Sequence, residues 1–124
     1  MVTVQEILPL ADVQKFLKQM DAESTYKMCH QACVWLAVEI KKAGIPDYSL
    51  HLATGTYLGK DHSWLIVEGS EEPHQIIDMT VDQFENIEVP YVCNYDNEKY
   101  QLENSISLIS DPDDLKNFVE SLGD

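Results

Sequence analysis

Residues 29–46 read CHQACVWLAVEIKKAGIP, and this stretch predicts the clearest helix of the chain. Its apolar residues recur at steps of three and four, which is the spacing of one face of an α-helix. These residues are Cys33, Leu36, Ala37 and Ile40. Two lysines fill the last turn, and Gly44 and Pro46 then end the helix. A polar loop, residues 21–28, comes before it, so we expect Cys29 at or near the helix start.

The residues after Gly44 predict strands. Extended runs cover residues 48–57, 62–68 and 75–79, and turn-forming residues separate them. We expect neighbouring antiparallel strands. Because alternate residues of a strand share a face, His62 and Trp64 should point to the same side of the sheet.

Weaker patterns occupy the rest of the chain. Short helices are predicted at residues 4–8 and 12–20, a helical turn at 81–84, short strands at 89–95 and 106–109, and a last helix at 112–122. No linker or repeat divides these segments. The chain therefore predicts one α+β domain, residues 1–124, in which the helix from Cys29 packs on an antiparallel sheet and further helices lie near both termini.

The composition of the chain is strongly acidic. Its 124 residues include 22 aspartates and glutamates against 8 lysines and no arginine, a formal net charge of −14. Nucleic acid is an unfavourable partner, because binding phosphates requires clustered lysine and arginine. The charge could serve solubility alone, attraction to a basic protein, or mimicry of nucleic acid, and the sequence leaves these three open.

Nothing in the sequence predicts a membrane segment or an exported protein. The longest apolar-dominated stretch, residues 32–40, is too short to cross a bilayer, and the first residues lack the pattern of a signal peptide. We therefore expect a cytoplasmic protein with reduced thiols, although non-classical export is not excluded by this pattern. Three cysteines are an odd number and do not form a closed disulfide framework.

Three short segments carry the residue types of a cysteine nucleophile site: Cys29-His30-Gln31-Ala32, His62-Ser63-Trp64 and Ile76-Ile77-Asp78-Met79-Thr80. Such catalysis needs a thiolate, a base that takes the thiol proton, and a third group that orients the base. A thiol at a helix start also gains from the helix dipole, which lowers its pKa. Cys29, His62 and Asp78 are thus the predicted catalytic residues.

The three segments resemble the core motifs of the transglutaminase-like branch of the papain-like cysteine enzymes: a Cys that opens a helix, His-x-Trp and Asp-x-Thr. The resemblance covers residues 28–84 and implies a papain-like core. It also implies that Cys29 is the nucleophile, His62 the general base and acid, and Asp78 the residue that holds the imidazole. Members catalyse transglutamination, glutamine deamidation or the hydrolysis of peptides and amides, and they need no cofactor.

The chain departs from the family pattern at the second donor to the oxyanion. Papain-like enzymes often take this donor from an Asn or Gln a few residues before the nucleophile, where this chain has Glu23, Ser24 and Thr25. A carboxylate there would repel an oxyanion. The backbone N–H of Cys29 could be one donor, and the candidates for the other, which could also contact the substrate, are Tyr26, Gln31 and Trp64.

Cys33 follows Cys29 by one helical turn, which invites comparison with a zinc site that includes His30 and His62. We expect no metal, because the chain offers no second pair of closely spaced ligands. Cys33 is better interpreted as a core residue and Cys93 as an isolated thiol.

The sequence therefore predicts a cysteine-dependent hydrolase or acyltransferase that acts on an amide of a protein or peptide, and the acidic charge of the chain is compatible with a basic substrate. Hydrolysis, as deamidation or peptide cleavage, is favoured because the chain shows no second module to bind an acceptor amine. The alternative is a non-catalytic binding protein that works through its acidic surface, as an inhibitor, an immunity factor or a nucleic-acid mimic. The substrate and the oligomeric state are not defined by the sequence.

Overall fold

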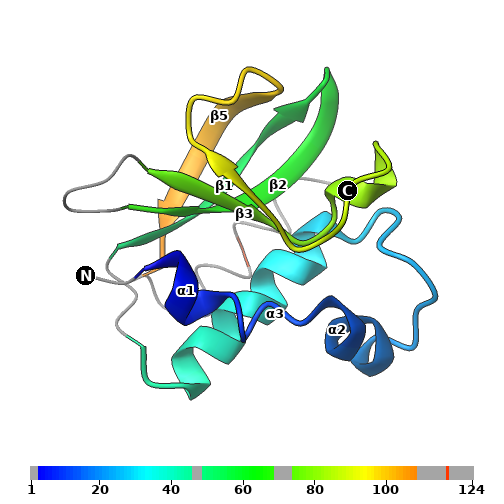
Figure 1. The fold of residues 1–124 in the computed structure, drawn as a ribbon, viewed down its shortest axis with the longest axis vertical. Helices are drawn as coiled ribbons and strands as arrows, with labels where there is room; N and C mark the ends of the chain where they lie inside the picture. The colour runs from blue at the N-terminus through cyan, green and yellow to red at the C-terminus, as the bar shows by residue number, and fades with distance from the viewer. Residues whose placement is uncertain (1–2, 46–48, 69–73, 109–116, 118–124) are drawn as a thin grey trace.

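The computed structural model describes residues 3–45, 49–68, 74–108 and 117, and within them it is a mixed α+β structure with three α-helices and one five-stranded antiparallel sheet. The elements are α1 (Val4–Ile7), α2 (Val13–Gln19), α3 (Cys29–Lys42), β1 (Leu50–Tyr57), β2 (Lys60–Val67), β3 (Gln75–Asp78), the 3₁₀ turn η1 (Val81–Gln83), β4 (Tyr91–Asn94) and β5 (Tyr100–Ser107). The strand order is β4-β3-β2-β1-β5, and the helices lie on one side of the sheet (Figure 1).

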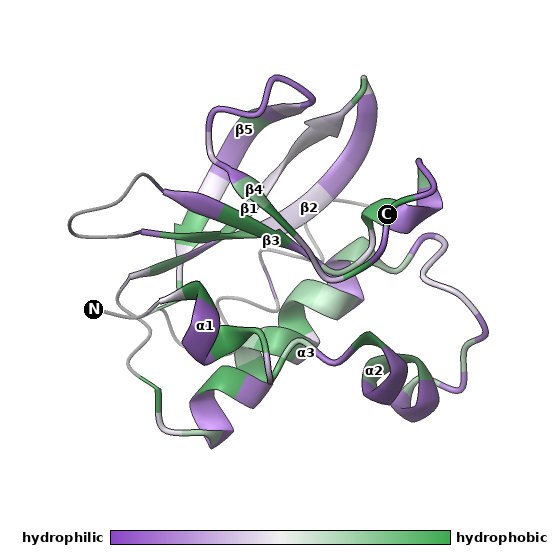
Figure 2. Cartoon of the chain, in the orientation of Figure 1, coloured by the Kyte–Doolittle hydropathy of each residue, from purple (hydrophilic) through white to green (hydrophobic). Residues whose placement is uncertain are grey.

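Helix α3 packs against the sheet through the apolar face that the sequence predicts. Leu36 and Ile40 are almost fully buried, and they belong to one cluster with Leu52 and Leu65 of the central strands and with residues of α1 and α2. Hydrophobic residues accordingly recur along all three helices, whereas β5 is largely hydrophilic (Figure 2). The helix begins at Cys29 as predicted, and Gly44, with a φ of +72°, follows its end.

A second, aromatic cluster covers the opposite face of the sheet. Trp64 and Ile66 belong to it, whereas Leu65 and Val67 belong to the α3 side, so the predicted alternation along β2 is confirmed. Its other buried members are Ala53, Tyr57, Ile76, Val81 and Tyr100. The sheet is therefore buried on both faces near its centre.

Strand β1 pairs antiparallel with β2, with Gly55 opposite His62, and β2 pairs with β3, with Leu65 opposite Ile77. These three strands, η1 and β4 lie where the sequence predicts them, within a few residues. Strand β5 is longer than predicted, since the pattern indicates only residues 106–109. The predicted helix at 112–122 lies outside the described residues, apart from the helical Asn117. No helix in the described parts of the chain has the length and apolar character to span a membrane.

Candidate active site

Cys29 is the first residue of α3, and its side chain is 8% exposed. The residue before it, Met28, provides no side-chain hydrogen bond to cap the helix. The first N–H groups of a helix have no intrahelical acceptor, so the N–H of Cys29 remains able to donate. The thiol therefore lies at the positive end of the α3 dipole, beside a backbone N–H that the helix itself does not engage.

His62 of β2 and Asp78 at the end of β3 form a fully buried pair. Nε2 of His62 lies 2.6 Å from Oδ2 of Asp78, and both side chains are 0% exposed. A carboxylate only accepts hydrogen bonds, so Nε2–H donates and Nδ1 is left as the basic ring nitrogen. Nδ1 is buried and makes no hydrogen bond to any residue that the structure describes.

Two further donors hold the carboxylate of Asp78 in place. The backbone N–H of Thr80 donates to Oδ1 at 2.9 Å, and the hydroxyl of Tyr100 donates to Oδ2 at 2.8 Å. Burial and the charge of Asp78 raise the pKa of Tyr100, so this hydroxyl stays protonated and remains a donor. With three donors, the buried carboxylate has a fixed position from which it orients the imidazole.

The surroundings of Cys29 favour its negatively charged thiolate, and those of His62 favour its positively charged imidazolium. Burial acts to raise the pKa of Cys29, but the neighbouring imidazoles of His30 and then His62 lower it to about 6. Burial acts to lower the pKa of His62, but Asp78 and Cys29 raise it to about 9. Between these values the stable form is a thiolate beside an imidazolium, which is the reactive state of a cysteine nucleophile.

Cys29 opens onto a cavity of about 530 Å³. His30 of α3, Thr54 and Gly55 of β1, and Phe84 at the end of η1 line it. Its remaining wall residues are polar, charged or aromatic: Tyr26, Lys27, Lys60, Asp61, Gln83, Glu103 and Asn104. His62 and Asp78 are not among the lining residues, so a molecule in the cavity would meet the thiol first.

The structure places the three tentative contact residues differently. Tyr26 lines the cavity and is 66% exposed. Trp64 is buried, and its ring packs beside that of His62 with centroids 6.0 Å apart, so it supports the imidazole from the aromatic cluster and does not line the cavity. Gln31 is exposed on α3 and lies outside the lining set.

Two residues that the sequence analysis did not select lie in this site. His30 lines the cavity and is the largest influence that lowers the pKa of Cys29. Gln83 of η1 lines the cavity, and its Oε1 accepts from the backbone N–H of Lys27 at 2.9 Å. The sequence signal for His30 is its position next to Cys29. Gln83 had no comparable signal, because its contact spans 56 residues.

The other two thiols have different surroundings. Cys33 of α3 is buried in the core between the helix and the sheet, as predicted, and burial raises its pKa well above the usual range. Cys93 on β4 is half-buried, and burial raises its pKa to about 11. Cys29 is therefore the only described cysteine whose surroundings favour the thiolate at neutral pH.

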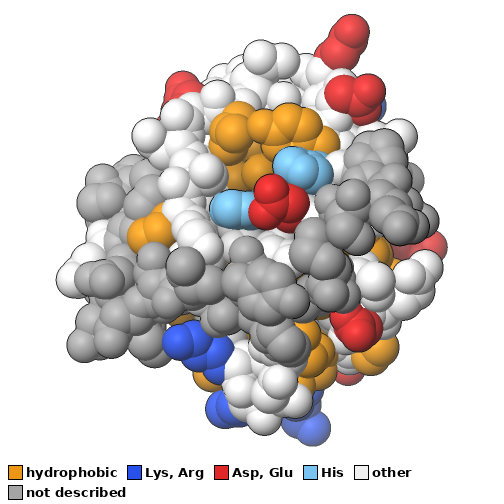
Figure 3. Space-filling model, turned by 90° about the vertical axis from the view of Figure 1, so that its left-hand side faces the viewer, with side chains coloured by type: hydrophobic (Ala, Val, Ile, Leu, Met, Phe, Trp, Pro, Cys, Tyr) orange, Lys and Arg blue, Asp and Glu red, His pale blue; other side chains and the backbone are white. Residues whose placement is uncertain are grey.

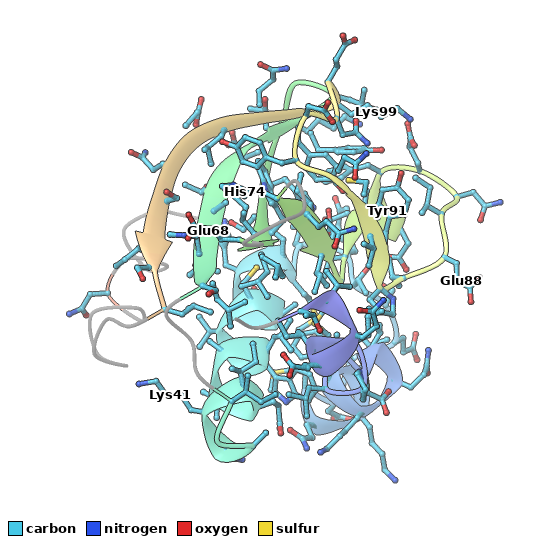
Figure 4. The ribbon with its side chains drawn as sticks, turned by 60° about the vertical axis from the view of Figure 1, so that its left-hand side comes forward. Lys41, Glu68, His74, Glu88, Tyr91 and Lys99 are labelled. Atoms are coloured by element: carbon cyan, nitrogen blue, oxygen red, sulfur yellow. The ribbon has the colours of Figure 1, made fainter. Side chains whose placement is uncertain are left out.

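A separate polar cluster lies at the other end of β1 and β2. Nε2 of His51 lies 3.2 Å from Oε2 of Glu68, and Nε2 of His74 lies 3.8 Å from Oε1 of the same residue. Figure 3 shows an acidic side chain between two histidines on this face, and Figure 4 shows Glu68 and His74 on the same side of the sheet. Among the described residues, no group of three or more His, Cys, Asp or Glu side chains could hold a metal ion.

Comparisons of the chain with protein-family models, with curated proteins and with solved structures gave no match. The chemistry of the site must therefore be argued from its own geometry.

Proposed function

We propose that this protein is a cysteine-dependent acyl-transfer enzyme that acts on a carboxamide or peptide bond of a protein substrate. The observation that carries the proposal is the buried His62–Asp78 pair, with Nε2 and Oδ2 2.6 Å apart, next to a thiol whose pKa is about 6 and which opens onto a cavity. A structural cysteine has no need of a lowered pKa or an oriented imidazole.

The finer assignment is to the transglutaminase-like branch of the papain-like enzymes, with a papain-like core. Its support is the order of Cys29, His62-Ser63-Trp64 and Asp78-Met79-Thr80 in the sequence, together with a nucleophile helix that packs on an antiparallel sheet.

The mechanism follows from the roles of the three residues. The Cys29 thiolate attacks the carbonyl carbon, a C–S bond forms, and the carbonyl π electrons move to oxygen. When the tetrahedral intermediate collapses, the C–N bond breaks and the amine leaves with the proton of the His62 imidazolium. Water then attacks the thioester while His62 takes its proton, which releases the acid and restores the thiolate. Asp78 fixes the ring throughout.

Hydrolysis of a protein substrate, as glutamine deamidation or peptide cleavage, is the favoured reaction. The net charge of −14 favours a basic substrate, since long-range attraction would raise the rate of encounter. The same charge is the observation that favours the alternative, a non-catalytic acidic binding protein on the same fold.

Site-selective alkylation tests the proposal. We expect iodoacetamide to modify Cys29 first at pH 7, with a rate that rises as the pH passes about 6 and then levels off, because the thiolate is the reacting species. Peptide mapping of the adducts measures the three thiols separately. Cys93 is a built-in control, since it is more exposed than Cys29 but has a pKa of about 11.

His62→Ala should delay the rise in rate to higher pH, because the imidazolium that stabilises the thiolate is lost. Equal and slow reaction of all three cysteines in the wild-type protein would reject the enzyme and favour the acidic binding protein. For a reactive Cys29, intact-mass analysis of candidate basic proteins then separates the reactions: a gain of about 1 Da indicates deamidation and fragments indicate cleavage.

A further inference from the structure

Two hydrogen bonds tie the turn after Asp78 to the loop before Cys29. The hydroxyl of Thr25 donates to Asp82, and the backbone N–H of Lys27 donates to Oε1 of Gln83 at 2.9 Å. Both contacts join segments more than 50 residues apart in the sequence. They hold η1 against the start of the nucleophile helix, at the edge of the cavity.

The contact with Lys27 also determines the positions of the oxygen and the nitrogen of the Gln83 side-chain amide. A backbone N–H can only donate, so the atom that it meets must be the amide oxygen. The NH₂ group therefore lies on the other side of the amide plane. Its orientation is set by the backbone of the residue two positions before Cys29.

No acceptor for this NH₂ group lies among the residues that the structure describes. Nε2 of Gln83 is buried and makes no hydrogen bond within the described part of the chain, although the residue lines the same cavity as Cys29. An unsatisfied buried donor costs about 1–3 kcal/mol, so such groups are rare and call for an acceptor from outside the described residues. The acceptor missing here is one that would enter with a ligand.

We infer that Nε2 of Gln83 and the backbone N–H of Cys29 are the two donors that bind the oxyanion formed when the Cys29 thiolate adds to a carbonyl group. The inference rests on the proposed function. It assigns the second donor to a residue after the Asp78 motif, whereas the sequence analysis sought it among Tyr26, Gln31 and Trp64. The ligand class that this donor recognises is an acyl carbonyl, since a carbonyl oxygen becomes a strong acceptor only as it gains negative charge.

Two reagents that attack the same thiolate separate this role from a structural one. Iodoacetamide alkylates sulfur by displacing iodide, and no oxyanion forms. p-Nitrophenyl acetate acylates sulfur through a tetrahedral oxyanion, which collapses to a thioester and releases p-nitrophenolate. The rate of acylation divided by the rate of alkylation at Cys29 therefore reports on oxyanion binding. A change in the thiolate population alters both rates equally and cancels in this ratio.

Gln83→Glu is the decisive variant, because the new carboxylate keeps an oxygen for the N–H of Lys27 and replaces the NH₂ group by an acceptor. We expect acylation to slow by about tenfold or more while alkylation changes little, since removal of one oxyanion donor typically costs that much or more. Gln83→Leu should show the same selective loss. Gln31→Glu is the matched control: it makes the same change at an exposed position two residues after Cys29, outside the cavity lining, and leaves the Gln83 donor in place, so the ratio should stay near that of the wild type.

Each other outcome overturns the inference. Parallel losses of acylation and alkylation in Gln83→Glu would mean that Gln83 acts on the thiolate or the loop, and unchanged rates would mean that it makes no contact with the oxyanion. A wild-type protein that is alkylated at Cys29 but not acylated would overturn the oxyanion site while the reactive thiol stands. A wild-type Cys29 no more reactive than Cys93 would instead reject the proposed function, and this inference with it.

Discussion

At the scale of single residues, the site combines one thiol with two imidazoles. His62 is fully buried and oriented by Asp78, whereas His30 lies on the cavity wall beside Cys29. The two histidines therefore suit different tasks. The orientation of His62 by Asp78 suits a base. His30 acts on the Cys29 sulfur electrostatically, from the cavity side.

We expect His30→Ala to raise the pKa of Cys29 above its value of about 6, because His30 is the largest influence that lowers it. The rise of the alkylation rate with pH should move to higher pH, and the rate at pH 6 should fall by several-fold, since a shift of one unit reduces the thiolate fraction there about fivefold. Alkylation by iodoacetamide across the pH range measures the shift.

Gln31→Ala is the control for that variant. It changes the next residue of the same helix, which is exposed and does not line the cavity, and its pH profile should match the wild type. An unchanged profile in His30→Ala would show that His62 and the helix dipole alone stabilise the thiolate.

At the scale of secondary structure, the sheet brings His62 and Asp78 together through its register. Leu65 pairs with Ile77, so Asp78 lies one residue beyond that pair on the face that also carries Trp64. His62 lies two residues from Trp64 on the same face of β2. Neighbouring antiparallel strands and side-chain alternation thus suffice to place the imidazole and the carboxylate side by side.

This explains how much of the site could be predicted. The helix at Cys29 and the three strands have strong local patterns, and the three catalytic candidates lie on them. Strand β5 was underestimated because most of its residues are polar and exposed, so its apolar pattern is weak, and pairing with β1 is what makes it a strand. Tyr100 and Gln83 reach the site through contacts of 22 and 56 residues in sequence separation, which no local pattern reports.

The pairing of β1 with β5 depends on Gly55. The register shifts between Thr54 and Gly55, and a Cβ atom on Gly55 would lie 1.9 Å from the backbone oxygen of Gln101. That oxygen cannot move without breaking the strand pair. Gly55→Ala should therefore lower the free energy of unfolding by about 1–3 kcal/mol, as overpacking commonly does. Urea unfolding followed by circular dichroism measures the change.

Ser105→Ala provides the matched control, since Ser105 pairs with Ala53 in the same two strands and is exposed. Its free energy of unfolding should stay within about 0.5 kcal/mol of the wild type. If Gly55→Ala were equally harmless, the close approach of β1 and β5 at this point would not exist in solution.

At the scale of the whole molecule, the dominant property is uncompensated negative charge. With 22 acidic residues and 8 lysines, at least 22 − 8 = 14 carboxylates have no lysine to pair with. The structure describes two lysine ion pairs, Lys15–Glu39 at 4.0 Å and Lys99–Glu85 at 3.2 Å; the lysine of each pair is exposed to solvent, so the pairs contribute little. Self-repulsion in the compact state should therefore outweigh attraction between surface charges.

This balance predicts that salt stabilises the protein. Raising the salt from 0.01 M to 0.15 M shortens the screening length from about 30 Å to about 8 Å, which weakens repulsion between distant carboxylates more than it weakens contact pairs. The midpoint of urea unfolding should rise accordingly. The double variant Glu88→Gln, Asp96→Asn changes two exposed residues and brings the net charge from −14 to −14 + 2 = −12, so its midpoint should rise less. A midpoint that falls with salt would mean that attraction between opposite charges dominates. The excess negative charge would then not destabilise the folded protein, and a basic partner could not stabilise it by neutralising that charge.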